Sequence, residues 1–151
     1  MTKKTVACKD KFGKEHQIPK ERLSFRIGVA GILQNDTSIF LIKHPRTNKW
    51  ELPGGEVELG ESLEDALGRE YSEEPGMVIK DFQFLTYRED FYYIESQNAA
   101  YHSIRLFFTV NSANSKIPTE GEFVDYRSMT QDNTNELTYS VLKELFKKKK
   151  Y

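Results

Sequence analysis

The stretch from Gly55 to Met77 constrains this chain more than any other, because it carries three closely spaced glutamates, Glu70, Glu73 and Glu74. Intervals of three and four residues place side chains on one face of an α-helix. Like charges at this spacing repel one another and destabilise the helix that carries them. A divalent cation held between the carboxylates would offset the repulsion, so the spacing indicates a metal site.

The phase of the predicted helix supports this interpretation. At about 100° per residue, the apolar residues Leu63, Ala66 and Leu67 fall within about 60° of Glu70, and the other two glutamates fall in the same arc. The acidic cluster therefore continues the apolar stripe and is predicted to face the core or a cleft beside it, where unpaired anions are costly. The alternative is a surface acidic patch, which the C-terminal end of a helix disfavours.

The same stretch resembles the box of the Nudix hydrolase family at each of its positions, with two unusual residues. The positions that match are Gly55, Glu61, Arg69, Glu70, Tyr71, Glu73, Glu74, Gly76 and Met77. Tyr71 stands where the family usually has an aliphatic residue. Pro75 fills a free position and disfavours helical geometry at Glu74 just before it. We therefore expect the helix to end there, and the direction of the Glu74 side chain is the least determined of the three.

The resemblance extends beyond the box at 55–77 to nearly all of the chain after about residue 22. The segments that resemble parts of the family are 50–54, 26–33, 38–44, 102–110, 122–129 and 137–150. This resemblance implies one Nudix hydrolase domain over residues 1–151, of the α/β class. The family fold is an α/β/α sandwich, with a mixed β-sheet between helices.

Hydrophobic patterning and turn residues predict the individual elements. Residues 1–22 form an N-terminal extension, in which Thr5 to Ile18 is expected to be a charged hairpin at a sheet edge with its turn at Gly13. Ser62 is a good N-cap for the box helix, and Gly76 is a stop signal. Further strands are expected over 25–33, 38–43, 78–87, 91–94, 100–111 and 123–129, and a last helix over 136–149.

Composition limits the class of protein. The chain has 151 residues, 38% hydrophobic and 30% charged, which suits one domain with its own core. Its net charge is −1, so no overall field attracts nucleic acid or membrane, and we expect neither as a partner. The single cysteine, Cys8, excludes an intrachain disulfide and fits a reducing compartment.

The chain shows no targeting signal. No apolar run reaches the roughly 18 residues of a membrane span, and the polar start lacks the apolar segment of a signal peptide. We therefore expect a cytoplasmic protein that is a monomer or a homodimer. The lysines at 147–150 are interpreted as cations that complement the dipole of the last helix rather than as a partner site.

The glutamates suit a magnesium ion. Mg²⁺ prefers octahedral oxygen ligands and is usually held by one or two carboxylates together with substrate phosphates. The resemblance implies that the carbonyl of Gly54 joins Glu70, Glu73 and Glu74 as a ligand. It also implies a further glutamate from a downstream loop, for which Glu120 and Glu122 are both candidates. The expected cofactor is Mg²⁺, with Mn²⁺ as an alternative ion.

The family chemistry is metal-assisted hydrolysis of a phosphoanhydride. Its substrate is a nucleoside diphosphate linked to a group X, and a carboxylate accepts a proton from the attacking water. Glu70 and Glu73 both remain candidates for this base, because family members differ. Arg69 is grouped with the catalytic residues through its family role, which is to pair with Glu61 and hold the loop against the helix.

Two box glycines and several cations outside the box complete the predicted site. Gly55 and Gly76 are expected to be structural, since a tight turn and a helix end require them. His44 stands where some triphosphate-cleaving members carry a substrate-binding arginine. The other candidates for substrate contact are Arg26 and Arg46, and Tyr87, Tyr92 and Tyr101 are candidates for stacking on a nucleobase.

Three functions are compatible with these residues. The first is a MutT-like pyrophosphohydrolase acting on a nucleoside triphosphate, including an oxidised one. The second is a hydrolase of ADP-ribose, a nucleotide sugar or a dinucleoside polyphosphate, for which the N-terminal extension is an argument. The third is a non-catalytic nucleotide-binding domain, which the intact box disfavours. In each case the partner is a small nucleotide.

Overall fold

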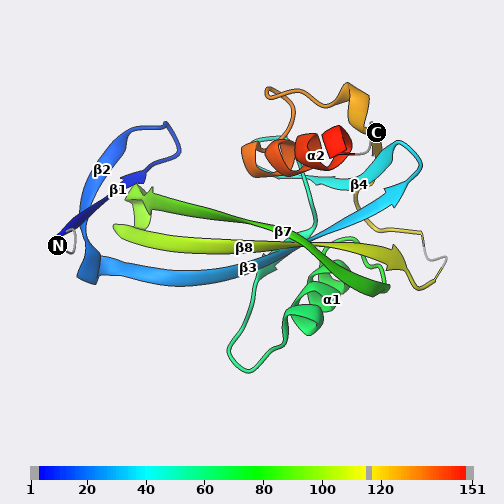
Figure 1. The fold of residues 1–151 in the computed structure, drawn as a ribbon, viewed down its shortest axis with the longest axis horizontal. Helices are drawn as coiled ribbons and strands as arrows, with labels where there is room; N and C mark the ends of the chain where they lie inside the picture. The colour runs from blue at the N-terminus through cyan, green and yellow to red at the C-terminus, as the bar shows by residue number, and fades with distance from the viewer. Residues whose placement is uncertain (1–3, 115–116, 149–151) are drawn as a thin grey trace.

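A curled mixed β-sheet with one helix on each face forms the centre of the molecule (Figure 1). The structure is a computed structural model that describes residues 4–114 and 117–148. The strands are β1 (Thr5–Lys9), β2 (Glu15–Pro19), β3 (Leu23–Asn35), β4 (Ser38–Lys43), β5 (Trp50–Glu51), β6 (Gly54–Glu56), β7 (Ile79–Ile94), β8 (Ala99–Ser112) and β9 (Glu122–Asp125). The helices are α1 (Leu63–Glu73) and α2 (Glu136–Lys148), with short 3-10 turns at 20–22, 95–97 and 126–128.

The sheet is mixed, as predicted. Its strand order is β2-β1-β7-β8-β3-β4-β5, while β6 pairs with β3 and β9 pairs with β4. The central pair, β3 and β8, runs parallel from Leu23 opposite Ala100 to Leu33 opposite Val110. The β7–β8 pair is antiparallel. The parallel centre is covered by helices on both faces, which is the usual environment of parallel strands.

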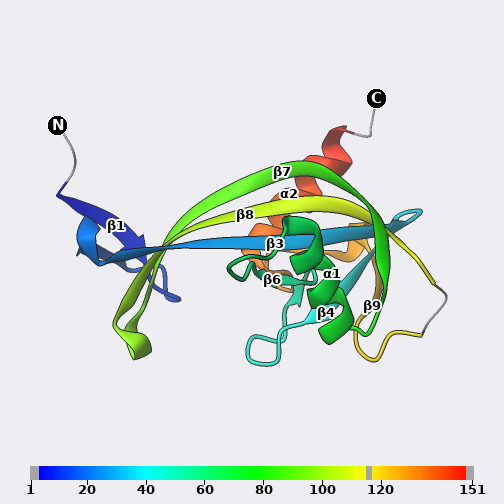
Figure 2. The same cartoon turned by 90° about the horizontal axis from the view of Figure 1, so that it is seen from below.

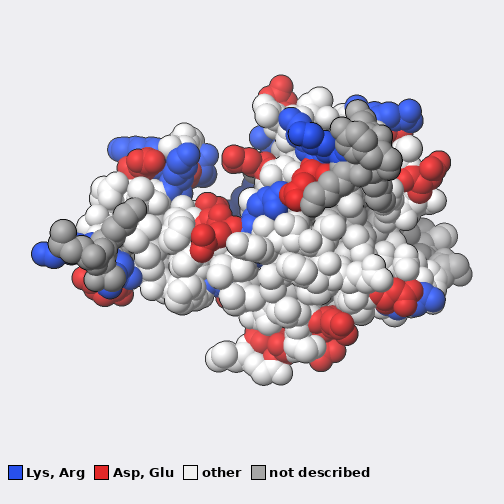
Figure 3. Space-filling model, viewed as in Figure 1, with Lys and Arg blue, Asp and Glu red and all other residues white. Residues whose placement is uncertain are grey.

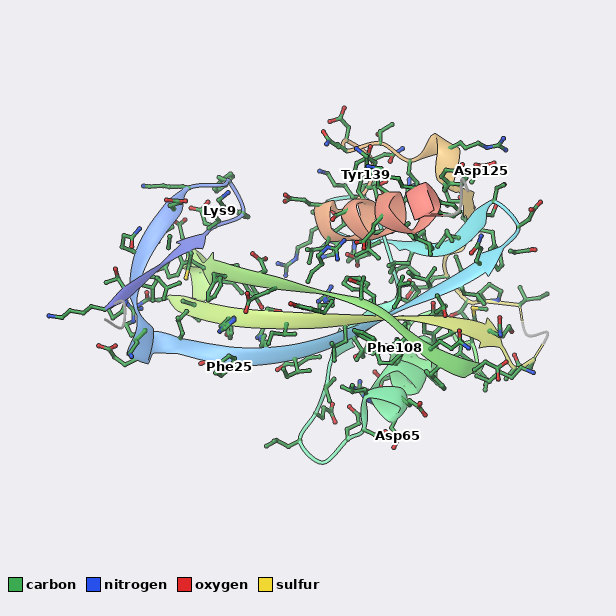
Figure 4. All side chains as sticks on the ribbon, viewed as in Figure 1. Lys9, Phe25, Asp65, Phe108, Asp125 and Tyr139 are labelled. Atoms are coloured by element: carbon green, nitrogen blue, oxygen red, sulfur yellow. The ribbon has the colours of Figure 1, made fainter. Side chains whose placement is uncertain are left out.

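Helix α1 covers one face of the sheet and helix α2 covers the other, so the predicted α/β/α sandwich is confirmed. Ala66, Leu67 and Tyr71 of α1 pack with residues such as Val29 and Phe108. Figure 4 shows Phe108 between the sheet and α1. On the other face, the buried residues of α2 that pack against the sheet are Val141, Leu142, Leu145 and Phe146.

The alternation in β8 was predicted correctly. Leu106, Phe108 and Val110 pack toward α1, whereas Phe107 packs toward α2. The predicted helix start is also confirmed, because the Ser62 hydroxyl accepts a hydrogen bond of 3.0 Å from the backbone N–H three residues later.

The end of α1 follows the prediction made from Pro75. The last helical residue is Glu73, and Glu74 is the C-cap, whose N–H still bonds the carbonyl of Glu70. Gly76 lies after the helix with a φ of 72°, in the left-handed region that favours glycine. The helix thus stops before Gly76 rather than at it.

Two strand predictions were wrong in their limits. The expected strands 78–87 and 91–94 are one strand, β7, because β8 pairs with its polar middle as well, with Arg88 opposite Arg105. Backbone pairing does not require apolar side chains, so a charged run within a strand is a poor break signal. The expected strand 123–129 ends at Asp125, whose carboxylate accepts from the Arg127 N–H and starts a 3-10 turn.

Strands β3, β7 and β8 continue well beyond the two helices and end at the β1–β2 hairpin (Figure 2). The predicted hairpin is confirmed, from Thr5 opposite Pro19 to Lys9 opposite Glu15, and β2 is an edge strand.

No helix in the described part of the chain is long and apolar enough to cross a membrane. Of the lysine run at 147–150, residues 149 and 150 lie outside the described residues.

Tyr71, the unusual box residue, is fully buried against β3. Its hydroxyl donates a buried hydrogen bond of 2.9 Å to the carbonyl of Gly31. A Cβ at Gly31 would lie only 2.7 Å from the Tyr71 ring, so the glycine makes room for the aromatic side chain. The tyrosine is thus a matched part of the core.

Replacing Tyr71 by phenylalanine is expected to lower the free energy of unfolding by about 1–2 kcal/mol, because the buried Gly31 carbonyl loses its partner. Urea denaturation measures this difference. Nucleotide hydrolysis should change little, since the hydroxyl faces the core. An unchanged urea midpoint would mean that the hydrogen bond is not important for stability.

Candidate active site

Two glycines bring the loop before α1 into contact with β3 and with the helix. A Cβ at Gly54 would lie 2.1 Å from the Val29 carbonyl oxygen, and a Cβ at Gly55 would lie 2.3 Å from the Glu70 carboxylate. At Gly54 the close atoms belong to the backbone, so only glycine fits there, whereas a side chain at Gly55 would require the Glu70 carboxylate to move. The close approach sets the Gly54–Gly55 backbone directly beside the carboxylates of α1.

Arg69 connects the loop to the helix through its whole guanidinium group. It forms two hydrogen bonds to the Glu61 carboxylate, of 2.7 and 3.0 Å, and one of 3.0 Å to the carbonyl of Glu56. The remaining nitrogen bonds Glu70 at 3.0 Å and Glu73 at 3.2 Å. The pKa of Glu61 is lowered to about 2, mainly by the hydrogen bond from Arg69. The Arg69–Glu61 contact expected from the resemblance is present.

The three box glutamates are not equally buried. The Glu70 side chain is 14% exposed, whereas the Glu73 side chain is 60% exposed. The prediction that all three continue the buried stripe is therefore wrong for Glu73. The buried arc of α1 also includes Tyr71, which shifts its centre away from Glu73.

Glu74 lies within a group of four carboxylates. Its pKa is raised to about 8, first by burial, then by a hydrogen bond to Glu70 and by the charges of Glu70, Glu51 and Glu120. The side chain whose direction was least determined by the sequence thus points into the acidic group. All donors here are carboxylate oxygens, beside the Gly54 backbone, and this is the chemistry that Mg²⁺ accepts. The donor chemistry therefore fits a magnesium ion, although no three of these carboxylates have ligand atoms within 4.8 Å of one another in the described part of the chain.

The structure separates the two downstream candidates. Glu120, in the loop before β9, acts electrostatically on Glu74. Glu122 is exposed at the start of β9, where it pairs with Leu41. Only Glu120 is placed with the box carboxylates.

A polar cleft of about 410 Å³ opens beside this group on the face of the sheet that carries α2. It is lined by His44, Glu51, Leu52, Gly54, Arg88, Asp90, Tyr92, Ser103, Arg105, Asn135 and Leu137. Figure 3 shows a notch in the surface between the hairpin and the part that carries α2, with acidic and basic side chains at its edges. Glu51 lines the cleft and also acts electrostatically on Glu74, so the cleft lies next to the carboxylate group.

The structure brings only part of the predicted substrate contacts to this cleft. His44 lines it, and its Nδ1 accepts N–H groups of its own loop. Arg26 lies farther out on the same face, bonded to the Tyr92 hydroxyl at 2.9 Å and 3.9 Å from the centre of the Tyr101 ring. Arg46 is exposed on the loop and does not line the cleft.

Of the three tyrosines considered for base stacking, Tyr92 lines the cleft. Tyr101 lies next to it, with ring centres 5.2 Å apart. Tyr87 is exposed and belongs to the opposite face of β7, five residues before Tyr92 in an alternating strand.

Sequence reasoning missed four residues of this site, Glu51, Arg88, Asp90 and Arg105. They come from three strands, β5, β7 and β8, whose relative register the chain does not reveal. The one available signal was the charge of Arg88 and Asp90, which lie between the two strands expected over 78–87 and 91–94.

A second group of candidate ligands, Asp10, His16 and Glu95, lies at the hairpin end of the molecule. Asp10 uses one carboxylate oxygen to accept the backbone N–H groups of Phe12 and Lys14. Its other oxygen bonds His16 at 2.8 Å. These contacts explain the group as part of the hairpin turn and its attachment, near the labelled Lys9 in Figure 4.

Comparison with known proteins agrees with this geometry. The NUDIX domain profile matches residues 24–148. The nucleoside triphosphatase NudI of Salmonella arizonae and that of Salmonella newport are each 35% identical over 108 residues, covering 65% of this chain and 77% of the relative. The MutT NUDIX hydrolase of Burkholderia pseudomallei has a TM-score of 0.64 at 25% identity, over 80% of this chain and 97% of that one.

A NUDIX hydrolase from Nitrosomonas europaea has the same fold, with a TM-score of 0.67 at 19% identity over 85% of this chain and 93% of that chain. The chain therefore belongs to the Nudix hydrolase family. It is an enzyme of the nucleotide pyrophosphohydrolase class, as the box predicted.

Proposed function

We propose that this enzyme hydrolyses a phosphoanhydride bond of a nucleoside triphosphate, including an oxidised one, with Mg²⁺ as its cofactor. The main observation is the group formed by Glu51, Glu70, Glu74 and Glu120 at the inner end of a cleft that also contains cationic side chains. The similarity to nucleoside triphosphatase NudI supports the same substrate class.

In this proposal Glu70, Glu74, Glu120 and the Gly54 carbonyl hold the metal, with Glu51 next to them. The bound ion would neutralise phosphate charge and make water more acidic. Mn²⁺ is the alternative ion. Two further tasks remain for the side chains of the site: a water must be deprotonated, and the phosphates must be held in position.

We prefer Glu70 over Glu73 as the group that accepts the proton from water. Glu70 is the more buried of the two, and Gly55 and Arg69 hold its carboxylate in place from two sides. Glu73 is largely exposed and its contact with Arg69 is longer. A base must be held within hydrogen-bond reach of its proton, which favours the better-positioned carboxylate.

The raised pKa of Glu74 predicts that metal affinity increases with pH. At pH 7 most of this carboxyl carries a proton in the metal-free protein, because its pKa is about 8. A bound cation must displace that proton. We expect the apparent affinity for Mg²⁺ to rise between pH 6.5 and 9, with release of up to one proton per ion. Calorimetry in buffers of different ionisation enthalpy measures both quantities.

In the metal-free protein, the same raised pKa makes the free energy of unfolding decrease with pH, whereas the affinity for Mg²⁺ increases. Glu74 has a pKa of 4.5 when unperturbed and about 8 in the folded protein, so the folded state binds more protons between these values. The free energy of unfolding of the metal-free protein should therefore fall as pH rises through this window. A Glu74→Gln variant should lack this dependence. A constant affinity for Mg²⁺ between pH 6.5 and 9 would contradict the proposal that the cation displaces a proton from Glu74.

A product screen tests the proposed function. The substrates are nucleoside and deoxynucleoside triphosphates, 8-oxo-dGTP, ADP-ribose, a nucleotide sugar and a dinucleoside polyphosphate, each with Mg²⁺, with Mn²⁺ and with chelator. We expect triphosphates to give a nucleoside monophosphate and pyrophosphate only when metal is added. Cleavage of ADP-ribose to AMP without turnover of triphosphates would replace the first substrate class by the second.

One observation favours that second class. The floor of the cleft continues outward over Tyr92, Tyr101 and Arg26, so a longer substrate would find a second aromatic surface there. A substrate with a second planar or sugar group, such as ADP-ribose or a dinucleoside polyphosphate, has a group to place on it.

A cytoplasmic location and the choice between monomer and homodimer remain predictions.

A further inference from the structure

Arg105 lines the cleft beside a residue that has no side chain, Gly28. It is directly opposite Gly28 in the β3–β8 pair. A Cβ at Gly28 would lie 3.1 Å from the Arg105 Nε and 3.4 Å from the carbonyl oxygen of Gly55. The Arg105 Nε and the carbonyl oxygen of Gly55 therefore both lie close to Gly28, next to the residue that carries the predicted metal-binding carbonyl, Gly54.

The other arginines on this face already have partners. Arg88 bonds Ser140 and Glu144 of α2, and Arg26 bonds Tyr92. Arg105 is half-buried, yet its guanidinium donates no hydrogen bond to any residue in the described part of the chain. A guanidinium has five N–H donors, and those of Arg105 face the cleft that it lines, where they are available to a ligand. An anion within the cleft would satisfy them.

The charges around Arg105 indicate what kind of anion fits. Burial raises the pKa of the Glu51 carboxyl, while the positive charges of His44 and Arg105 act in the opposite direction. Glu51 belongs to the carboxylate group around Glu74. Arg105 thus lies on the cleft side of the carboxylates that would hold the cation. A ligand that meets both must bind a cation and a guanidinium at once, and a phosphate chain does so.

We propose that Arg105 binds a phosphate group of the substrate, and that Gly28 provides the space for its guanidinium. This inference rests on the proposed function. Arg105 thereby becomes a substrate-binding residue in addition to His44, Arg26 and Arg46, the contacts predicted from the sequence. It also predicts that binding depends on the phosphate chain rather than on the nucleobase.

The test is direct binding of two probes, in Mg²⁺, to the full chain. The probes are inorganic triphosphate and a nucleoside triphosphate with a methylene bridge in place of the cleaved oxygen. Arg105→Gln should weaken binding of both probes by roughly 10- to 100-fold, the usual effect of losing a charge-assisted hydrogen bond. Arg88→Gln removes the same charge from the same cleft and should weaken binding less, since Arg88 is engaged by α2. Circular dichroism of each variant checks folding.

Gly28→Ala gives a second, independent test of the contact between Gly28 and Arg105. Its methyl group would lie 3.1 Å from the Arg105 Nε, so the guanidinium must shift by a few tenths of an ångström. We expect a smaller loss of binding for both probes than Arg105→Gln gives, and little further loss when the two changes are combined, because they act through one contact. The inference is overturned if Arg105→Gln binds triphosphate within twofold of wild type, if Arg88→Gln is equally harmful, or if wild type binds neither probe. Wild type that binds both probes but hydrolyses no nucleotide would reject the proposed function while leaving the binding comparison decisive.

Discussion

Glu70→Gln is expected to lower kcat by roughly 10²- to 10⁴-fold, the usual contribution of a positioned acid or base. The substitution keeps the shape of the side chain, so the contact with Gly55 and one hydrogen bond from Arg69 can remain. What it removes is a negative charge and a proton acceptor. The protein should stay folded, because the amide keeps the size of the carboxylate and its oxygen can still accept the hydrogen bonds from Arg69 and from the protonated Glu74.

Glu64→Gln is the matched control. Glu64 is an exposed carboxylate in the first turn of the same helix, away from the sheet. Its kcat should stay within about twofold of wild type, because surface substitutions outside special sites have small effects. Kinetics with a triphosphate and Mg²⁺ at pH 7 and 9 measure both variants. Turnover by Glu70→Gln at the wild-type rate would remove Glu70 from the role of base, and Glu73→Gln would then be the next variant to measure.

Much of the fold was predictable because it depends on local rules. The alternation of Leu106, Phe108 and Val110 defined a strand with its buried face, and Ser62 and Pro75 marked the two ends of the box helix. These signals act within a few residues of each other. The continuity of β7 was not predictable in this way, because the pairing of its charged middle is decided by β8.

The residues of the site also differ in whether a local sequence signal could identify them. Residues within the box were found because their spacing is local, although the exposure of Glu73 depends on how Tyr71 packs under β3. Glu51 and Arg105 come from separate strands, and only the register of the sheet brings them to one cleft. The space available to the Arg105 side chain depends further on Gly28, which has no side chain of its own. A single chain does not reveal which glycine lies beside which arginine.

Arg69→Ala is expected to reduce both activity and stability, which distinguishes it from Glu70→Gln. The guanidinium joins the loop carboxylate of Glu61 to the helix carboxylates of Glu70 and Glu73. Without it, the loop loses its attachment and three carboxylates lose their shared counter-charge. We expect kcat/KM to fall by at least about 100-fold, the scale of a misplaced catalytic group, together with a lower melting temperature at pH 7.

The pH dependence of the stability loss gives the sharper test. Because the pKa of Glu61 is lowered from 4.5 to about 2 by Arg69, its contribution is present above pH 4.5 and is lost as pH falls toward 2. The difference in melting temperature between wild type and Arg69→Ala should therefore shrink from pH 7 to pH 3. Arg127→Ala is the control for activity: Arg127 also lowers the pKa of its partner Asp125, so its stability loss should shrink toward low pH in the same way, but the pair lies outside the site and nucleotide hydrolysis should not change. If Arg69→Ala melts at the wild-type temperature at pH 7 yet loses activity, then Arg69 acts on the carboxylates alone, and the loop is held by the backbone contacts of Gly54 with β3.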